Sequence, residues 1–181
     1  MEPLLMTFFN TSQIKIYEMT TVFLLITAVL TALIAGLFYA YSCSVVLGLG
    51  KLSDTEYLRA MQSINREILN PVFFMSFMGT AVLLPLTTFL YRGEQPGFLF
   101  LLLATAAYLI GVFGVTVVGN VPLNDMLDQF DISNSTAEAV KQMRESFENR
   151  WNLLNNIRTA FSVISIVLVI CACIWNGELP K

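Results

Sequence analysis

The sequence predicts an all-α fold: a bundle of four transmembrane helices with two amphipathic helical segments capping one side. Hydrophobic residues make up 56% of the 181-residue chain and charged residues 13%, whereas a soluble domain carries about 25% charged residues. Four apolar stretches are also long enough to cross a bilayer, which takes about 20 helical residues. Because these stretches do not alternate apolar and polar residues, a β-barrel is not expected.

The chain is predicted to divide into three parts. Residues 1–18 lack strong structural signals and are interpreted as a short surface segment, disordered or an over-extended start before Met19. Residues 19–176 form the single four-helix membrane domain, and residues 177–181 form a C-terminal tail. The first apolar stretch is too long for a cleavable signal peptide and has no clear cleavage site.

The four predicted spans are Thr21 to about Leu47, Pro71 to Tyr91, Phe98 to Val118, and Ile157 to Trp175. Pro71 suits the first turn of the second span, and residues 92–97 predict a tight turn before the third. The third span is expected to end at residues 119–122, Gly-Asn-Val-Pro, with a polar loop through Asn134.

The first capping segment is predicted at residues 53–69. Ser53 and Glu56 have the spacing of a capping box. An apolar stripe at helical spacing follows at Tyr57, Met61, Ile64 and Ile68.

The second capping segment is predicted as the first half of a long fourth helix. Ser135 and Glu138 have capping-box spacing, and residues 136–175 contain neither Gly nor Pro. A helix of about 40 residues is about 60 Å long, while the hydrocarbon core is about 30 Å thick. The helix therefore extends beyond the bilayer. Its apolar stripe is expected to pack on the first capping segment; the stripe comprises Val140, Met143, Phe147, Trp151 and Leu154.

The charges predict the orientation of the chain in the cell membrane. Both capping segments lie on one side because an even number of spans separates them. Seven Lys and Arg residues lie on that side (Lys51, Arg59, Arg66, Lys141, Arg144, Arg150, Arg158), and three on the other (Lys15, Arg92, Lys181). The positive-inside rule therefore predicts a cytoplasmic cap and both termini outside.

Small residues form a continuous row on two of the spans. The rows are Ala28, Ala32, Gly36, Ala40, Ser44 and Gly48 in the first span, and Ala107, Gly111 and Gly119 in the third. Small residues allow close helix packing in lipid, so both rows are expected inside the bundle. The alternative is a homo-oligomer contact.

Composition excludes several classes of function. The net charge is −3 and no basic run is present, so nucleic acid is not an expected partner. The chain has no His, and its three Cys residues lie in apolar stretches without zinc-site spacing. No metal or other cofactor is predicted, and the expected partners are membrane lipid and an apolar small molecule.

Polar side chains gather near the cap-side ends of the spans: Tyr41, Asn65, Asn120, Asn124, Trp151, Asn155 and Arg158. Trp151, Asn155 and Arg158 share one helix face, and Arg158 can donate hydrogen bonds to the carboxamides of Asn65, Asn120 or Asn124. The functional interpretation is a polar pocket in which Arg158 clamps an anion or a carbonyl. The structural interpretation is interfacial packing, with Asn residues capping helix ends and Arg158 extended toward water.

Four ordered motifs carry a family resemblance: residues 36–42 (GLFYAYS), residues 61–65 (MQSIN) followed by Asn70-Pro71, residues 120–124 (NVPLN), and residues 151–159 (WNLLNNIRT). Together they resemble the anthrone oxygenase-like family of small membrane proteins, over about Thr20 to Trp175. Most members are bacterial and of unknown function. The resemblance implies a four-helix membrane bundle and, from some fungal members, oxidation of an anthrone to an anthraquinone by O₂ without an evident metal or flavin. The shared polar set would be Asn65, Asn120, Asn124, Trp151, Asn155 and Arg158. The chain departs from the family at Asn156, where relatives often carry His, so it lacks a His base.

Two functions remain open from the sequence. In the first, the chain oxygenates an apolar phenolic or anthrone-like substrate, with Arg158 and Asn155 as catalytic residues and Asn65, Asn120, Asn124, Trp151 and Tyr41 binding the substrate. In the second, it is a non-catalytic scaffold that binds lipid or a membrane partner. A permease is disfavoured because the mid-span regions have no ionisable residues.

Overall fold

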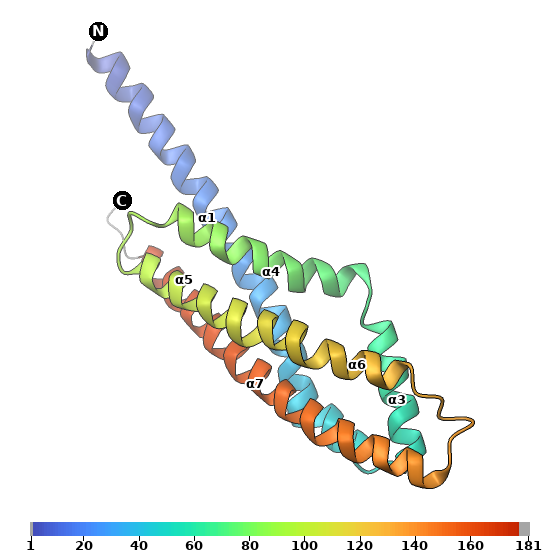
Figure 1. Ribbon diagram of the computed structural model, residues 1–181. Helices are drawn as coiled ribbons and strands as arrows, with labels where there is room; N and C mark the ends of the chain where they lie inside the picture. Colours follow the sequence, from blue (N-terminus) through green and yellow to red (C-terminus); the bar gives the residue numbers. More distant parts are fainter. Residues whose placement is uncertain (1, 178–181) are drawn as a thin grey trace.

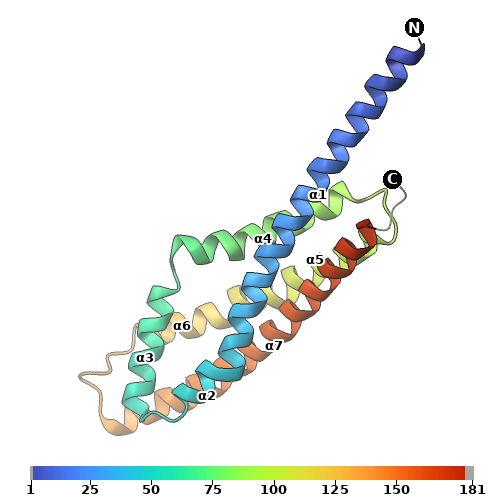
Figure 2. The same ribbon diagram turned by 180° about the vertical axis from the view of Figure 1, so that it is seen from behind.

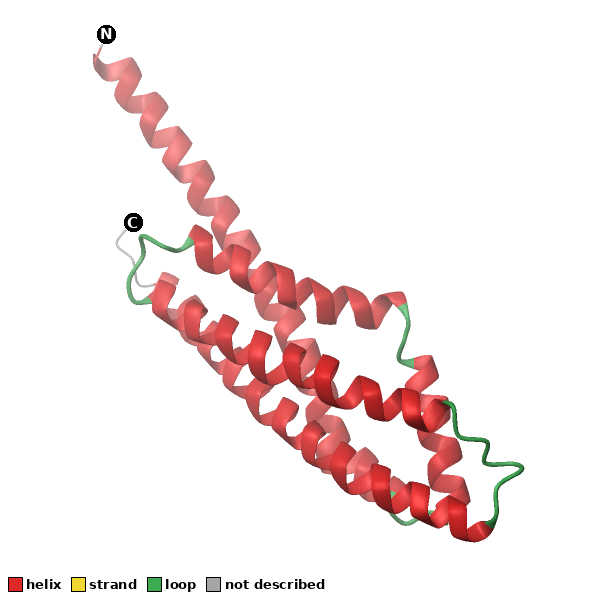
Figure 3. Cartoon of the chain, in the orientation of Figure 1, coloured by secondary structure: helices red, strands yellow, loops and turns green. Residues whose placement is uncertain are grey.

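The computed structural model describes residues 2–177, with side chains described for residues 18–175; residues 178–181 of the predicted tail lie outside this range. All regular structure in the described part is helical (Figure 3), as predicted. The elements are α1 (Glu2–Ala40), η1 (Tyr41–Val45), α2 (Val46–Leu49), α3 (Asp54–Glu67), α4 (Pro71–Leu90), α5 (Gly97–Ala106), η2 (Ala107–Gly114), η3 (Thr116–Asn120), α6 (Val121–Asp128) and α7 (Ala137–Gly177). The η elements are π-helical turns, wider than α-helical turns.

Four helices of the described part are long and apolar enough to cross a membrane, which indicates a multi-pass membrane protein. They cover residues 18–49, 71–90, 97–128 and 137–175. Around the bundle, α1 packs against α4 and α7, and α5 packs against the same two helices (Figures 1 and 2). The N-terminal part of α1 projects beyond the other helices. The predicted boundary between the N-terminal segment and the membrane domain, after residue 18, falls within this continuous helix. The division stays a prediction.

The cap confirms the predicted contact between the two amphipathic segments. The Ser53–Glu56 capping box starts α3, with the Ser53 amide donating to Glu56 Oε2 at 3.1 Å. The rings of Tyr57 on α3 and Phe147 on α7 meet edge to face, with centroids 6.5 Å apart. Helix α7 is 41 residues long, so one continuous helix contributes both to the cap and to the bundle.

The predicted end of the third span at residues 119–122 is wrong, because the helix continues from η3 into α6 and ends at Asp128. Pro122 has no N–H, and its ring clashes with the carbonyl four residues back in a regular α-helix. The turn before it is π-helical: the Val121 N–H donates to Thr116 O, five residues back. This wider turn lets the chain pass Pro122 without ending the helix.

The second predicted capping box is also wrong, since Thr136 caps α7. Thr136 Oγ1 accepts the Ala139 N–H at 3.2 Å. Ser135 instead donates its hydroxyl to Asp131 O in the preceding loop, at 2.6 Å.

The two rows of small residues lie in different environments, one inside the bundle and one on its surface. On the third span, a Cβ at Gly111 would lie 2.0 Å from Phe161 Cγ, so this row lies inside the bundle, as predicted, where it packs closely on α7. The first-span prediction is wrong: a Cβ at Gly36 or Gly48 would meet no atom within 4 Å, and the row from Ala32 to Gly48 is exposed. Larger side chains, including Leu24, Ile34 and Phe38, fill the bundle instead. A homo-oligomer contact through the exposed row stays a prediction.

Candidate functional site

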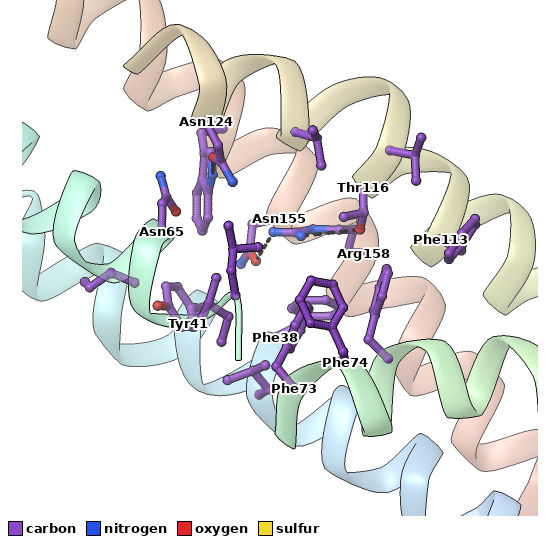
Figure 4. Close-up of a pocket in the computed structure, with 18 of the residues that line it drawn as sticks. Phe38, Tyr41, Asn65, Phe73, Phe74, Phe113, Thr116, Asn124, Asn155 and Arg158 are labelled. Carbon is purple, nitrogen blue, oxygen red and sulfur yellow. Dashed lines mark hydrogen bonds between the residues drawn. The ribbon is translucent and has the colours of Figure 1, made fainter. Parts of the chain in front are cut away.

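A cavity of about 240 Å³ lies where the cap meets the bundle (Figure 4). Its walls come from all four spans and from α3 of the cap. The lining residues are Leu37, Phe38, Tyr41, Ile64, Asn65, Ile68, Leu69, Phe73, Phe74, Phe77, Met78, Phe113, Thr116, Val117, Val121, Asn124, Trp151, Asn155 and Arg158. The cavity is therefore mostly apolar, with a small polar group at the cap end.

Aromatic rings form much of the apolar wall. The Phe77 ring stacks between its neighbours, with centroids 5.2 Å from Phe73 and 5.5 Å from Phe113. Nearer the cap, the rings of Tyr41 and Trp151 contact each other at a tilt of 47°, with centroids 5.8 Å apart. Flat faces of this kind favour a flat aromatic ligand, because offset stacking adds to the gain from burial.

Arg158 is the only charged residue of the cavity lining, and it is 6% exposed. Its Nη2 donates to Asn155 Oδ1 at 3.0 Å and its Nη1 donates to Thr116 Oγ1 at 3.4 Å. The guanidinium lies 4.4 Å from the centroid of the Phe38 ring. The Arg158 Nε has no hydrogen-bond partner, and no carboxylate of the described residues 18–175 forms an ion pair with Arg158. A buried charge is costly unless paired, so this site favours a ligand with a negatively charged or electron-rich oxygen.

A second row of hydrogen bonds holds Asn155 in place behind Arg158. Asn155 Nδ2 donates to Ser42 Oγ at 2.9 Å, which turns Asn155 Oδ1 toward the guanidinium. Ser42 Oγ also lies 2.8 Å from Thr159 Oγ1, and Thr159 donates to Phe38 O at 3.0 Å. Ser42 belongs to the π-helical turn η1, so the irregular part of the first span positions the Arg158 site.

The structure brings together all but one of the predicted site residues, since Tyr41, Asn65, Asn124, Trp151, Asn155 and Arg158 all line the cavity. Trp151 Nε1 donates to Asn124 Oδ1 at 2.9 Å. Asn120 does not line the cavity; it is 1% exposed and neither of its side-chain amide atoms has a partner in the described part of the chain.

The predicted partners of Arg158 are wrong, because it bonds Asn155 and Thr116 instead of Asn65, Asn120 or Asn124. The Asn124 oxygen is taken by Trp151. Thr116, Ser42 and Phe38 were missed as site residues. Thr116 lies four residues before Asn120, and that spacing is the one signal that could have found it. Glu67 and Asp125, the acidic residues nearest in sequence to the predicted site residues, are exposed and do not line the cavity.

The cavity opens sideways between α4 and the third span. The exposed lining residues are all apolar: Leu69, Phe74, Met78, Val117 and Val121. In Figure 3, α4 and the third span diverge toward the cap. The opening therefore lies on the outer surface of the bundle, which faces lipid in a membrane protein.

The profile of the anthrone oxygenase family matches residues 71–168, more than half of the chain. The chain belongs to the anthrone oxygenase family. No curated protein and no solved structure matches the chain. The match includes Thr116, Asn155 and Arg158, whereas Tyr41 and Asn65 lie before its first residue.

The site can bind and polarise an oxygen atom, but its lining supplies no strong base. No His, Asp or Glu in the described part of the chain lines the cavity. Among the described residues 18–175, no group of three or more His, Cys, Asp or Glu side chains could hold a metal ion. The chemistry that the lining residues themselves offer is stabilisation of an oxyanion in an apolar, aromatic surrounding.

Proposed function

We propose that this member of the anthrone oxygenase family oxygenates a flat, apolar phenolic or anthrone-like substrate with O₂, holding the substrate oxygen at Arg158. One observation carries the proposal: a buried guanidinium, which has no carboxylate partner among the described residues, faces a cavity walled by aromatic rings. An oxyanion on an aromatic ring system would pair with the guanidinium and stack against the aromatic walls.

The cavity size and its opening support the same class of substrate. A volume of about 240 Å³ lies just below the usual range for drug-sized ligands, which begins at about 300 Å³. The cavity therefore suits a compact ring system. Such a molecule partitions into lipid, and the apolar opening between α4 and the third span offers it a direct path to the cavity.

The proposed reaction converts a ring CH₂ opposite the substrate oxygen into a carbonyl. Loss of one C–H proton gives an enolate, whose oxygen the Arg158 guanidinium stabilises. The enolate carbon passes its electrons to O₂ and forms a C–O bond, and proton uptake completes a hydroperoxide. Loss of the second C–H proton with cleavage of the O–O bond releases water and leaves the ketone. One O₂ is reduced, and its two oxygen atoms end in the new carbonyl and in water.

Arg158 contributes by stabilising the enolate relative to the neutral substrate. Donors that are fixed in place, here by Asn155 and Thr116, are more effective than water because they need no reorientation. No carboxylate or His of the described residues lines the cavity, so the substrate proton is expected to leave to solvent. The rate is accordingly expected to rise with pH until the substrate is fully ionised.

The test is to purify the protein in detergent and follow anthrone absorbance together with O₂ consumption. Arg158→Met preserves much of the side-chain volume while removing the charge, and is expected to lower kcat/KM by about 10²-fold to 10³-fold, as for loss of an oxyanion donor. Arg150→Met is the matched control, because Arg150 is an exposed residue of the same helix. Equal rates for wild type and Arg158→Met would refute the proposal.

The alternative is non-catalytic binding of the same kind of molecule. The absence of a carboxylate or a His from the described lining of the cavity favours it. Saturable, Arg158-dependent binding of anthrone without O₂ consumption would establish binding alone.

A further inference from the structure

We infer that Asn65 binds a second oxygen of the ligand, so that the site selects aromatic molecules with two separated oxygen functions. This inference rests on the proposed function, in which Arg158 holds the first oxygen. It adds a residue that determines specificity and contributes nothing to stabilising the enolate.

The Asn65 side chain makes no hydrogen bond to any described residue, and its buried Nδ2 has no partner. The other two carboxamides of the cavity lining are both engaged. Asn124 accepts from Trp151, while Asn155 donates to Ser42 and accepts from Arg158. Most buried polar atoms are paired in folded proteins, so the free amide of Asn65 points to a partner that arrives with the ligand.

The position of Asn65 separates it from Arg158. Asn65 lies on α3 of the cap, whereas Arg158 lies on α7 among the aromatic rings of the bundle (Figure 4). Trp151 lies close to the guanidinium, at 5.5 Å, and Tyr41 stands beside Trp151. A flat ligand lying along these two rings would present one end to Arg158 and the other to the cap.

The chemistry of the two groups differs, which assigns the two ends of the ligand. The guanidinium offers donors only and carries a charge, so it selects an anion or a carbonyl. The carboxamide offers both a donor and an acceptor, which matches a neutral hydroxyl. The ligand class is therefore a rigid aromatic compound with an ionisable or carbonyl oxygen at one end and a hydroxyl at the other.

The experiment compares two probes, 2-naphthol and 2,6-dihydroxynaphthalene, by isothermal titration in detergent micelles. In the wild type, the second hydroxyl is expected to tighten Kd on the order of tenfold, the value of a net hydrogen bond. In Asn65→Leu, which keeps a similar volume, both probes are expected to bind with the Kd that 2-naphthol has in the wild type. Ser63→Leu is the matched control, because Ser63 is an exposed residue on the same helix, and it is expected to keep the wild-type preference.

The outcomes separate the inference from the function on which it rests. If 2-naphthol binds in an Arg158-dependent manner but the second hydroxyl adds nothing, or adds equally in Asn65→Leu, the role of Asn65 is refuted and the proposed function stands. If neither probe binds the wild type, both are refuted. The affinity for 2-naphthol reports on the folding of each variant, so misfolding of Asn65→Leu would appear as loss of that affinity. In that case Asn65→Ala replaces it: loss of the preference for the second hydroxyl supports the inference, and an unchanged preference refutes it.

Discussion

Replacing either of two transmembrane glycines by alanine should have opposite effects on stability. A Cβ at Gly111 in η2 would lie 2.0 Å from Phe161 Cγ and 2.6 Å from Phe161 Cβ. The Phe161 Cβ is fixed to the α7 backbone, so rotation of the ring cannot relieve this contact and the helices must separate. A Cβ at Gly36 in α1 would meet no atom within 4 Å.

The magnitude follows from two effects. Both substitutions gain about 0.5–1 kcal/mol because alanine loses less conformational freedom than glycine in a helix. Only Gly111→Ala also overpacks a filled interface, which costs about 1–3 kcal/mol. The two variants should therefore differ by about 1–3 kcal/mol. For a chain of this size, that corresponds to a Tm difference of about 2–12 °C.

The assay is thermal unfolding in one detergent, followed by intrinsic tryptophan fluorescence and by the monodisperse fraction that survives heating. Gly36→Ala should match or exceed the wild-type Tm, and Gly111→Ala should fall below it. Removing the ring in Phe161→Ala should reduce the cost of Gly111→Ala, so a double-mutant cycle should show positive coupling. Equal Tm values for the two glycine variants would refute close packing of the third span on α7.

Two further predictions concern buried tyrosines and a helix cap. Tyr108→Phe should lower stability by about 1 kcal/mol, because the Tyr108 hydroxyl donates to Phe77 O at 2.9 Å. Tyr57→Phe should leave stability unchanged, because the buried Tyr57 hydroxyl has no hydrogen-bond partner among the described residues. Thermal unfolding of both variants checks this, and an equal loss of stability would contradict it. Hydrogen bonds from Ser53 lower the pKa of Glu56, so its contribution to α3 should be complete above the unfolded-state pKa of about 4.3 and be lost as pH falls through the lower folded-state value. Over this pH range, the Tm of Glu56→Gln should depend less on pH than the Tm of the wild type. Superimposable plots of Tm against pH would count against the capping role.

Local features of the sequence predicted much of the architecture. Hydropathy over about 20 residues marks a span regardless of what surrounds it, so the four spans were predictable. The Ser53–Glu56 cap and the apolar stripes of α3 and α7 depend on spacing within one helix. The same holds for the shared face of Trp151, Asn155 and Arg158, which are spaced four and three residues apart.

Contacts between helices were not predictable in the same way. The sequence contained two rows of small residues, but only the row with Gly111 packs inside the bundle. Likewise, Pro122 was expected to end the third span, and only the π-helical turn before it shows how the helix continues. For the small residues, the deciding atoms belong to another helix. For Pro122, the deciding feature is a local change from α-helical to π-helical hydrogen bonding.

The amino-acid sequence by itself determined the helical class, the four spans, the position of the cap and the level at which polar side chains gather. The tertiary structure alone decided that Arg158 faces an aromatic cavity, that no carboxylate of the described residues pairs with it, and that Thr116 and Asn155 hold it there. The physical reason is that lipid is as apolar as the helix surfaces it surrounds. Hydrophobicity therefore places a helix in the membrane but leaves its rotation open, and side-chain packing between helices sets which residues face the cavity.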